Sequence, residues 1–185
     1  MSESRADSAI ERYKLFLQKV DAFFSAAFER EGSRMKCGSG CDGCCHVHLT
    51  LFPIEADQLI AAARKLPEET RQRVIENATG WMQKDAAQCP LLLDRQCALY
   101  HSRPLICRSQ GLMLYFTGDD GEKAADACPL NFTGGKAVEA ASVFDLDQAN
   151  LVLVSLNADY VGRPSCALPQ RIDLVSALAT LDQDS

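Results

Sequence analysis

The sequence lacks the usual marks of a membrane protein, a secreted protein or a familiar enzyme. No apolar run approaches the roughly 20 residues that a helix needs to cross a bilayer. The first residues, MSESRAD, are charged and contain no apolar stretch, so we expect no signal peptide. A glycine-rich phosphate loop, a His-Glu-x-x-His motif and a nucleophile elbow are all missing. The sequence therefore leaves any catalytic residues unknown, and leaves open whether the protein is an enzyme.

Positive charge is also scarce. The chain has 19 Lys and Arg against 25 Asp and Glu, which gives a formal net charge of −6. Nucleic acids and anionic membranes are bound by basic surfaces. We therefore expect neither nucleic acid nor a membrane among the partners, and the sequence does not identify a protein partner.

Cysteine, by contrast, is abundant: the chain has 9 cysteines in 185 residues. Without a signal peptide we expect a cytoplasmic protein, and the cytosol keeps thiols reduced, so a disulfide framework explains them poorly. Thiolates are soft ligands that suit zinc ions and iron–sulfur clusters. We therefore predict that the partner is a metal ion, either zinc or iron, with an iron–sulfur cluster as one form of the latter. The predicted ligands are the clustered cysteines Cys37, Cys41, Cys44 and Cys45. Cys89, Cys97 and Cys107 follow as further candidates, for which metal ligation and a plain buried thiol both stay open at this point.

This set is richer than one tetrahedral zinc site requires. Cys41-x-x-Cys44 has the usual spacing of a metal-binding knuckle. Cys45 follows directly, and its side chain shares a direction with that of Cys44 only if the backbone turns sharply. The surplus predicts either more than one metal ion or a multi-iron centre. Cys128 and Cys166 lie far away in the sequence, and we expect both to be buried thiols without a metal.

Hydrophobic periodicity predicts a mostly α fold with small β-hairpins, in a single domain over residues 1–185. We expect an irregular cysteine-rich metal-binding centre surrounded by about five helices, because apolar residues recur three and four positions apart. Turn residues predict a tight hairpin at residues 94–96, a helical turn at 103–108 and a strand at 112–117 followed by a turn. His46–Leu51 also alternates like a short strand. The predicted helices span residues 8–30, 53–65, 67–87, 147–161 and 169–181.

The cysteine pattern resembles the CxxCxxCC family of zinc- or iron-chelating domains, to which proteins of the YkgJ type belong. The resemblance covers residues 37–108, with one extra residue in the first gap of the motif. It implies metal chelation with the seven cysteines as the pool of ligands, and it leaves the metal open. The matching stretches are Cys37-x3-Cys41-x2-Cys44-Cys45, Cys89-Pro90-x-Leu92 and Cys97-x2-Tyr100-x2-Arg103-Pro104-x2-Cys107-Arg108.

Two other functions remain open, the first of them in part by analogy with the family. The first is an iron–sulfur enzyme or redox protein, similar to a methylase of the same broad family. Cys37-x3-Cys41-x2-Cys44 also has the radical-SAM spacing, although the helical pattern that follows is unlike the repeated βα units of that fold. The second is a protein-binding module that a metal ion holds in shape, as in zinc ribbons.

Overall fold

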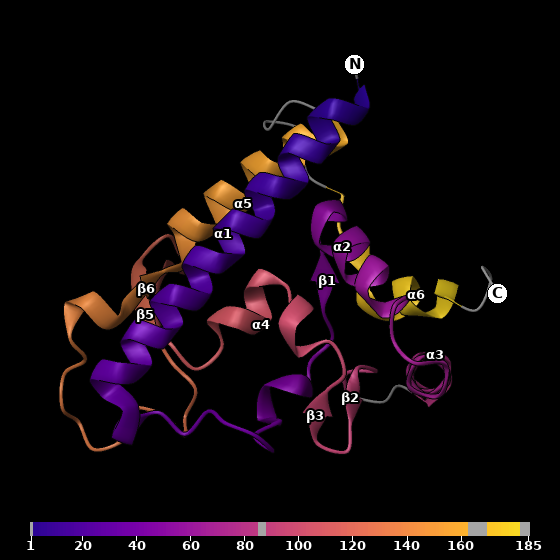
Figure 1. Ribbon diagram of the computed structural model, residues 1–185. Coiled ribbons are helices and arrows are strands. Elements are labelled where there is room, and N and C mark those ends of the chain that lie inside the picture. The colour runs from indigo at the N-terminus through magenta and orange to yellow at the C-terminus, as the bar shows by residue number, and fades with distance from the viewer. Residues whose placement is uncertain (1, 85–87, 163–169, 182–185) are drawn as a thin grey trace. The chain divides into compact units, whose positions relative to one another are not determined.

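The computed structural model describes residues 2–84, 88–162 and 170–181 of the chain (Figure 1). It is mostly helical with small sheets of two or three strands, which confirms the predicted fold class. The helices are α1 (Ser2–Glu31), α2 (Pro53–Ala63), α3 (Glu68–Lys84), α4 (Leu105–Ser109), α5 (Leu146–Val161) and α6 (Leu174–Ala179). The strands are β1 (Thr50–Leu51), β2 (Leu92–Leu93), β3 (Gln96–Cys97), β4 (Met113–Thr117), β5 (Lys123–Asp126), β6 (Val143–Asp145) and β7 (Ile172–Asp173).

The chain divides into two compact units. The first unit is formed by Met1–Gly38 and Leu105–Ala167, and the second by Ser39–Pro104 and Leu168–Ser185. Each unit therefore contains two separate stretches of the chain. The single domain over residues 1–185 stays a prediction. Across the described ranges, every helix is too short or too polar to traverse a bilayer.

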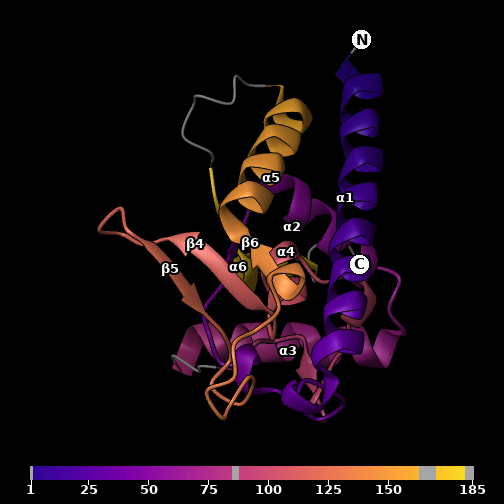
Figure 2. The same ribbon diagram turned by 90° about the vertical axis from the view of Figure 1, so that its left-hand side faces the viewer.

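In the first unit, α1 runs beside α5 (Figures 1 and 2). The buried side chains of α1 recur at helical spacing, as at Tyr13, Leu17 and Val20, which explains why this sequence forms a helix. The helix begins at Ser2, earlier than predicted, in a polar stretch that periodicity does not mark. Ion pairs of 2.8 Å from Arg5 and Arg12 to Asp159 tie this end of α1 to α5.

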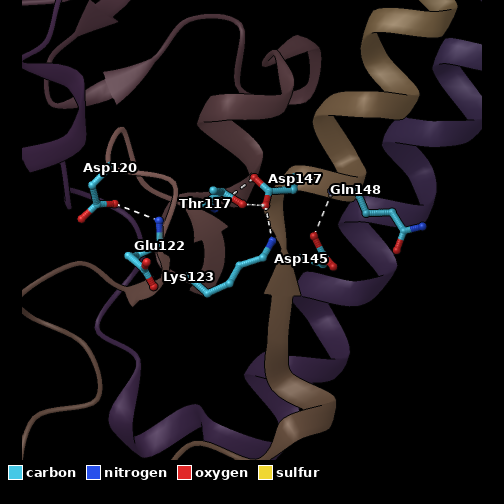
Figure 3. A network of polar contacts seen from close by, with 7 residues as sticks. All are labelled: Thr117, Asp120, Glu122, Lys123, Asp145, Asp147 and Gln148. Atoms are coloured by element: carbon cyan, nitrogen blue, oxygen red, sulfur yellow. Dashed lines mark hydrogen bonds and ion pairs between the residues drawn. The ribbon is translucent and has the colours of Figure 1, made fainter.

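A three-stranded sheet completes the first unit, in the order β5–β4–β6 (Figure 2). The antiparallel β4–β5 hairpin confirms the strand and turn that the sequence predicted. Asp147, at the start of α5, joins this hairpin to the helix (Figure 3). Its carboxylate accepts hydrogen bonds from the Thr117 hydroxyl at 2.6 Å and the Lys123 ammonium at 2.8 Å. These contacts, with the Lys123 bond the largest, lower the pKa of Asp147 to about 2.

The second unit packs α2, α3 and α6 around one apolar core. The antiparallel pair β1–β7 joins this unit's two stretches of chain, with Thr50 opposite Asp173. Asp173 also caps α6, because its carboxylate accepts a hydrogen bond from the Ser176 amide at 2.7 Å. Within the described part of the predicted helix 169–181, Ile172–Asp173 form strand β7 and the helix starts only at Leu174. The side chains that this stretch adds to the core are Leu174, Val175, Leu178 and Leu181.

Candidate metal centre

The backbone of the second unit brings two cysteine-bearing segments together. One is the cysteine loop, residues 39–45, which ends in a 3-10 turn over Gly43–Cys45. The other is the hairpin segment, residues 88–97, which contains β2 and β3. The amide of Cys89 donates a hydrogen bond to the carbonyl of Cys45 at 2.7 Å. Residues far apart in the sequence are thereby held as direct neighbours.

Four thiols from these segments act on one another. A hydrogen bond with the Cys45 side chain is the main cause that raises the pKa of Cys44 above its usual value, although Cys44 itself is exposed. Burial, with smaller contributions from the thiols of Cys97 and Cys44, raises the pKa of Cys89 to about 11. Burial likewise raises the pKa of Cys97, to which Cys44 contributes. Without a metal ion, these effects favour the protonated thiols of Cys44, Cys89 and Cys97.

The turn of the hairpin segment is fastened on both sides. Asp94 and Arg95 both adopt left-handed backbone conformations, with φ of 50° and 61°. The guanidinium of Arg73 donates two hydrogen bonds to the Asp94 carboxylate, at 3.0 and 3.1 Å. Arg95 reaches the cysteine loop, where it donates to the Gly40 carbonyl at 2.7 Å and pairs with Asp42 at 3.2 Å. We call these two contacts of Arg95 the Arg95 clasp, because they tie the hairpin turn to the loop.

The Arg95 clasp lowers the pKa of Asp42. The hydrogen bond from Arg95 and its positive charge hold the pKa of Asp42 below the usual value, against a smaller opposing effect of burial. Asp42 therefore stays ionised at neutral pH, and the ion pair persists there. Asp42 directly follows Cys41, so the clasp fixes the backbone between Cys41 and Cys44.

A second cation, Arg103, lies near the thiols. Its guanidinium stacks over the Tyr100 ring at 3.7 Å from the centroid, and its Nε donates to the Tyr100 carbonyl at 3.0 Å. The positive charge of Arg103 favours the thiolate forms of Cys44 and Cys97. Four thiolates around a divalent ion leave a net negative charge, so a fixed cation is suited to such a centre.

The predicted ligands are divided between the two units. Cys41, Cys44, Cys45, Cys89 and Cys97 lie in the second unit, whereas Cys37 and Cys107 lie in the first. Cys128 also lies in the first unit, and Cys166 falls outside the described residues.

His48 is engaged away from the cysteine loop. Its Nε2 forms an ion pair with Asp173, and its ring stacks on Trp81 with centroids 4.9 Å apart. These contacts support a structural role for His48 between the end of the loop and strand β7.

The fit of a metal ion rests on the chemistry of the donors. Among residues 2–84, 88–162 and 170–181, no three His, Cys, Asp or Glu side chains already form a group that could hold an ion. The four interacting thiols are nonetheless soft sulfur donors brought together from two segments, which is the donor type that zinc and iron–sulfur centres take. Binding would replace the thiol protons with the metal.

Comparison with known proteins identifies the same region. The model of the CxxCxxCC family, described as “Putative zinc- or iron-chelating domain”, matches residues 36–129, just over half of the chain. No curated protein and no solved structure matches the chain. The match includes all seven predicted cysteine ligands, together with Tyr100 and Arg103.

Proposed function

Because the chain belongs to the CxxCxxCC family of zinc- or iron-chelating domains, we propose that it binds zinc or iron through cysteine thiolates of two segments, the cysteine loop and the hairpin segment. One observation carries the proposal: the Cys89 amide donates to the Cys45 carbonyl at 2.7 Å, which holds the two cysteine-bearing segments together inside a single compact unit. Within this unit the Cys44 side chain also influences those of Cys45, Cys89 and Cys97. A set of four thiols is the number that a tetrahedral zinc ion takes.

The proposed ligand pool is wider than these four. Cys41 lies on the same loop, and Cys37 and Cys107 complete the seven cysteines of the family pattern. Seven sulfurs exceed the needs of one tetrahedral ion, which supports a second ion or a multi-iron cluster. The cytoplasmic location stays a prediction, and it agrees with a site of reduced thiols.

The identity of the metal is tested on full-length protein purified without oxygen. A zinc protein is colourless and contains zinc without labile sulfide. An iron–sulfur protein is brown, with a broad absorption band near ~400 nm and equivalent amounts of iron and sulfide. A colourless zinc protein would rule out the iron–sulfur enzyme and redox alternatives, whereas a cluster would support them.

The ligand assignment is tested by replacing single cysteines. Cys44→Ser and Cys89→Ser each remove one of the four interacting thiols, so we expect the metal content per chain to fall sharply. Cys128→Ser is the matched control, because Cys128 lies in the first unit on a loop. Equal metal content in all three variants and the wild type would contradict the assignment. Absence of metal from the wild type, even after addition of zinc or of iron with sulfide, would contradict the proposed function.

A further inference from the structure

The thiol of Cys37 lies directly against the backbone of Gly111 in the first unit. A Cβ atom placed on Gly111 would lie 2.3 Å from the Cys37 Sγ, far inside van der Waals contact. Gly111 also has a φ of +97°, a conformation that other residues rarely adopt. Glycine at this position therefore provides the space in which the Cys37 sulfur sits.

The side chain of Asn131 closes this space from another side. Asn131 is only 5% exposed, and its amide makes three hydrogen bonds. Its Oδ1 accepts from the Lys36 amide at 2.7 Å, while its Nδ2 donates to the Gly111 carbonyl at 2.7 Å and to the Cys37 Sγ at 3.4 Å. One acceptor and two donors are used, so the orientation of the amide is fixed and one N–H points at the sulfur.

The backbone beside Asn131 is strained and held in place. Phe132 has a φ of 53°, which is unusual and costly for a bulky residue. Its amide donates to the Arg34 carbonyl at 2.8 Å, and its ring lies 5.4 Å from the Arg34 guanidinium. Arg34 in turn pairs at 2.6 Å with Glu31, which is buried at the end of α1. Contacts from Arg34, in the 3-10 turn Gly32–Arg34 that follows α1, thus offset the strain that brings Asn131 to Cys37.

We propose that Asn131 positions Cys37 as a metal ligand: its amide orients the Cys37 sulfur and donates an N–H to it when a metal is bound. This inference rests on the proposed function, in which Cys37 is one of the ligands. Hydrogen bonds to ligand sulfur are a known means by which proteins set the affinity and electronic properties of a metal site. Asn131 lies beyond residues 36–129, so the family match does not assign it a role.

The test uses full-length protein with zinc and cobalt as probes. Zinc affinity is measured by competition with a coloured chelator, and the sulfur-to-cobalt charge-transfer band is recorded for the Co²⁺ form. Asn131→Asp keeps the shape of the side chain but removes both N–H donors. We expect zinc affinity to fall about 10- to 100-fold and the band to move to lower energy, because the sulfur becomes a stronger electron donor.

A double-mutant cycle separates positioning from a general loss of structure. Asn131→Ala is combined with Cys37→Ser, and the effect of the Asn131 change should disappear once the sulfur is absent. Asn157→Asp is the matched control, because Asn157 is another buried asparagine of the same unit. It places an equally unfavourable carboxylate in the interior, and we expect the cobalt band to stay where it is in the wild type.

The two hypotheses fail in different ways. If the wild type binds neither zinc nor cobalt, the proposed function is wrong. If the wild type binds both metals, and the Asn131 variants keep its affinity and its band, then the proposal for Asn131 is wrong. The same holds if Asn131→Ala weakens binding equally with and without the Cys37 sulfur. Where Asn131→Asp fails to fold, Asn131→Ala supplies the same measurements without a buried charge.

Discussion

Arg95 occupies a left-handed backbone conformation that glycine prefers. Its side chain nevertheless makes contacts with the cysteine loop that a glycine at this position would not make. Its φ of 61° costs roughly 1 kcal/mol for a residue with a Cβ. The contacts of the Arg95 clasp with Gly40 and Asp42 oppose this cost. An exposed ion pair stabilises a fold by no more than about 1 kcal/mol. The clasp is therefore better understood as a constraint on the shape of the cysteine loop than as a source of stability.

Arg95→Gly separates these two effects. The substitution relieves the left-handed strain, so we expect the free energy of unfolding to stay the same or rise slightly. It also releases the cysteine loop, so we expect metal affinity to fall by about tenfold. Urea denaturation of the metal-free protein and chelator competition measure the two quantities separately.

Asp94→Gly is the control for this prediction. It relieves strain in the neighbouring turn position, where φ is 50°, and removes the exposed contact with Arg73, but keeps the Arg95 clasp. Metal affinity should therefore stay near that of the wild type. If Asp94→Gly and Arg95→Gly reduce affinity equally, the clasp has no special part in the site.

At the scale of elements, one carboxylate adds to the pairing of β4 with β6 in joining the β4–β5 hairpin to α5. Asp147 accepts hydrogen bonds from Lys123 and Thr117, and its pKa is lowered to about 2 (Figure 3). A carboxyl group whose pKa is lowered by folding stabilises the fold at pH values above its pKa in the unfolded chain, about 3.9. This stabilisation is lost as the pH falls through its pKa in the folded protein.

Asp147→Asn should therefore show a specific pH dependence. We expect the metal-free variant to be less stable than the wild type by the same amount at pH 7 and pH 5. The difference should shrink as the pH falls from about 4 to about 2. Thermal unfolding across this pH range measures the difference in stability. Lys123→Met removes the ammonium group that bonds Asp147, so it should likewise remove most of the stabilisation by this carboxylate. A gap between wild type and variant that stays constant down to pH 2 would contradict this account.

The helix α6 completes the apolar core of the second unit, although it lies far from the rest of that unit in the sequence. Leu178 on this helix is 0% exposed and belongs to the core that α2 and α3 also form. We expect Leu178→Ala to lower the free energy of unfolding by about 2–5 kcal/mol, because it leaves a cavity in a packed core.

The matched control is Leu151→Ala on α5, where the leucine is 71% exposed. Its effect should stay within about 0.5 kcal/mol. Metal binding should weaken in Leu178→Ala at temperatures where the variant partly unfolds, and should be unaffected in Leu151→Ala. Equal stability of the two variants, measured by urea denaturation, would show that α6 is not part of this core.

At the scale of the whole molecule, metal binding should stabilise some regions and leave others unchanged. The Cys89 amide, bonded to the Cys45 carbonyl, connects the two segments of the proposed site. At free zinc of about 100 Kd, opening of these segments should become about 100-fold rarer. We therefore expect hydrogen exchange to slow in residues 39–45 and 88–97, while residues 123–126 exchange as before. Slowing in Cys44→Ser as large as in the wild type would contradict the assignment.

The extent to which the sequence predicts the structure depends on how far apart the interacting residues are. Helices such as α2 and α5 were predicted within one or two residues, because each carries its own apolar periodicity. Strands β6 and β7 were not predicted, since two or three residues are too few to show an alternation. Strand β7 occupies part of the helix predicted over 169–181, which is therefore shorter than predicted.

The same limit applies to the site. The cysteine spacing indicated a metal centre because its residues lie close together in the sequence, and the family match confirmed that region. The contacts of Arg95 with Gly40 and of Asn131 with Cys37 join residues far apart, and nothing in the local sequence of either pair marks them. Such positioning residues are found only once the chain is folded.

The division of the second unit between residues 39–104 and 170–181 has a consequence for the order of events during synthesis. The cysteines of this unit leave the ribosome well before the segment that supplies β7 and the apolar side chains of α6. Until that segment emerges, the nascent chain exposes thiols on an incomplete core, in a state prone to premature metal capture or oxidation. For the metal site that we propose, the expected time of loading is therefore after residues 170–181 have emerged, when the core can close.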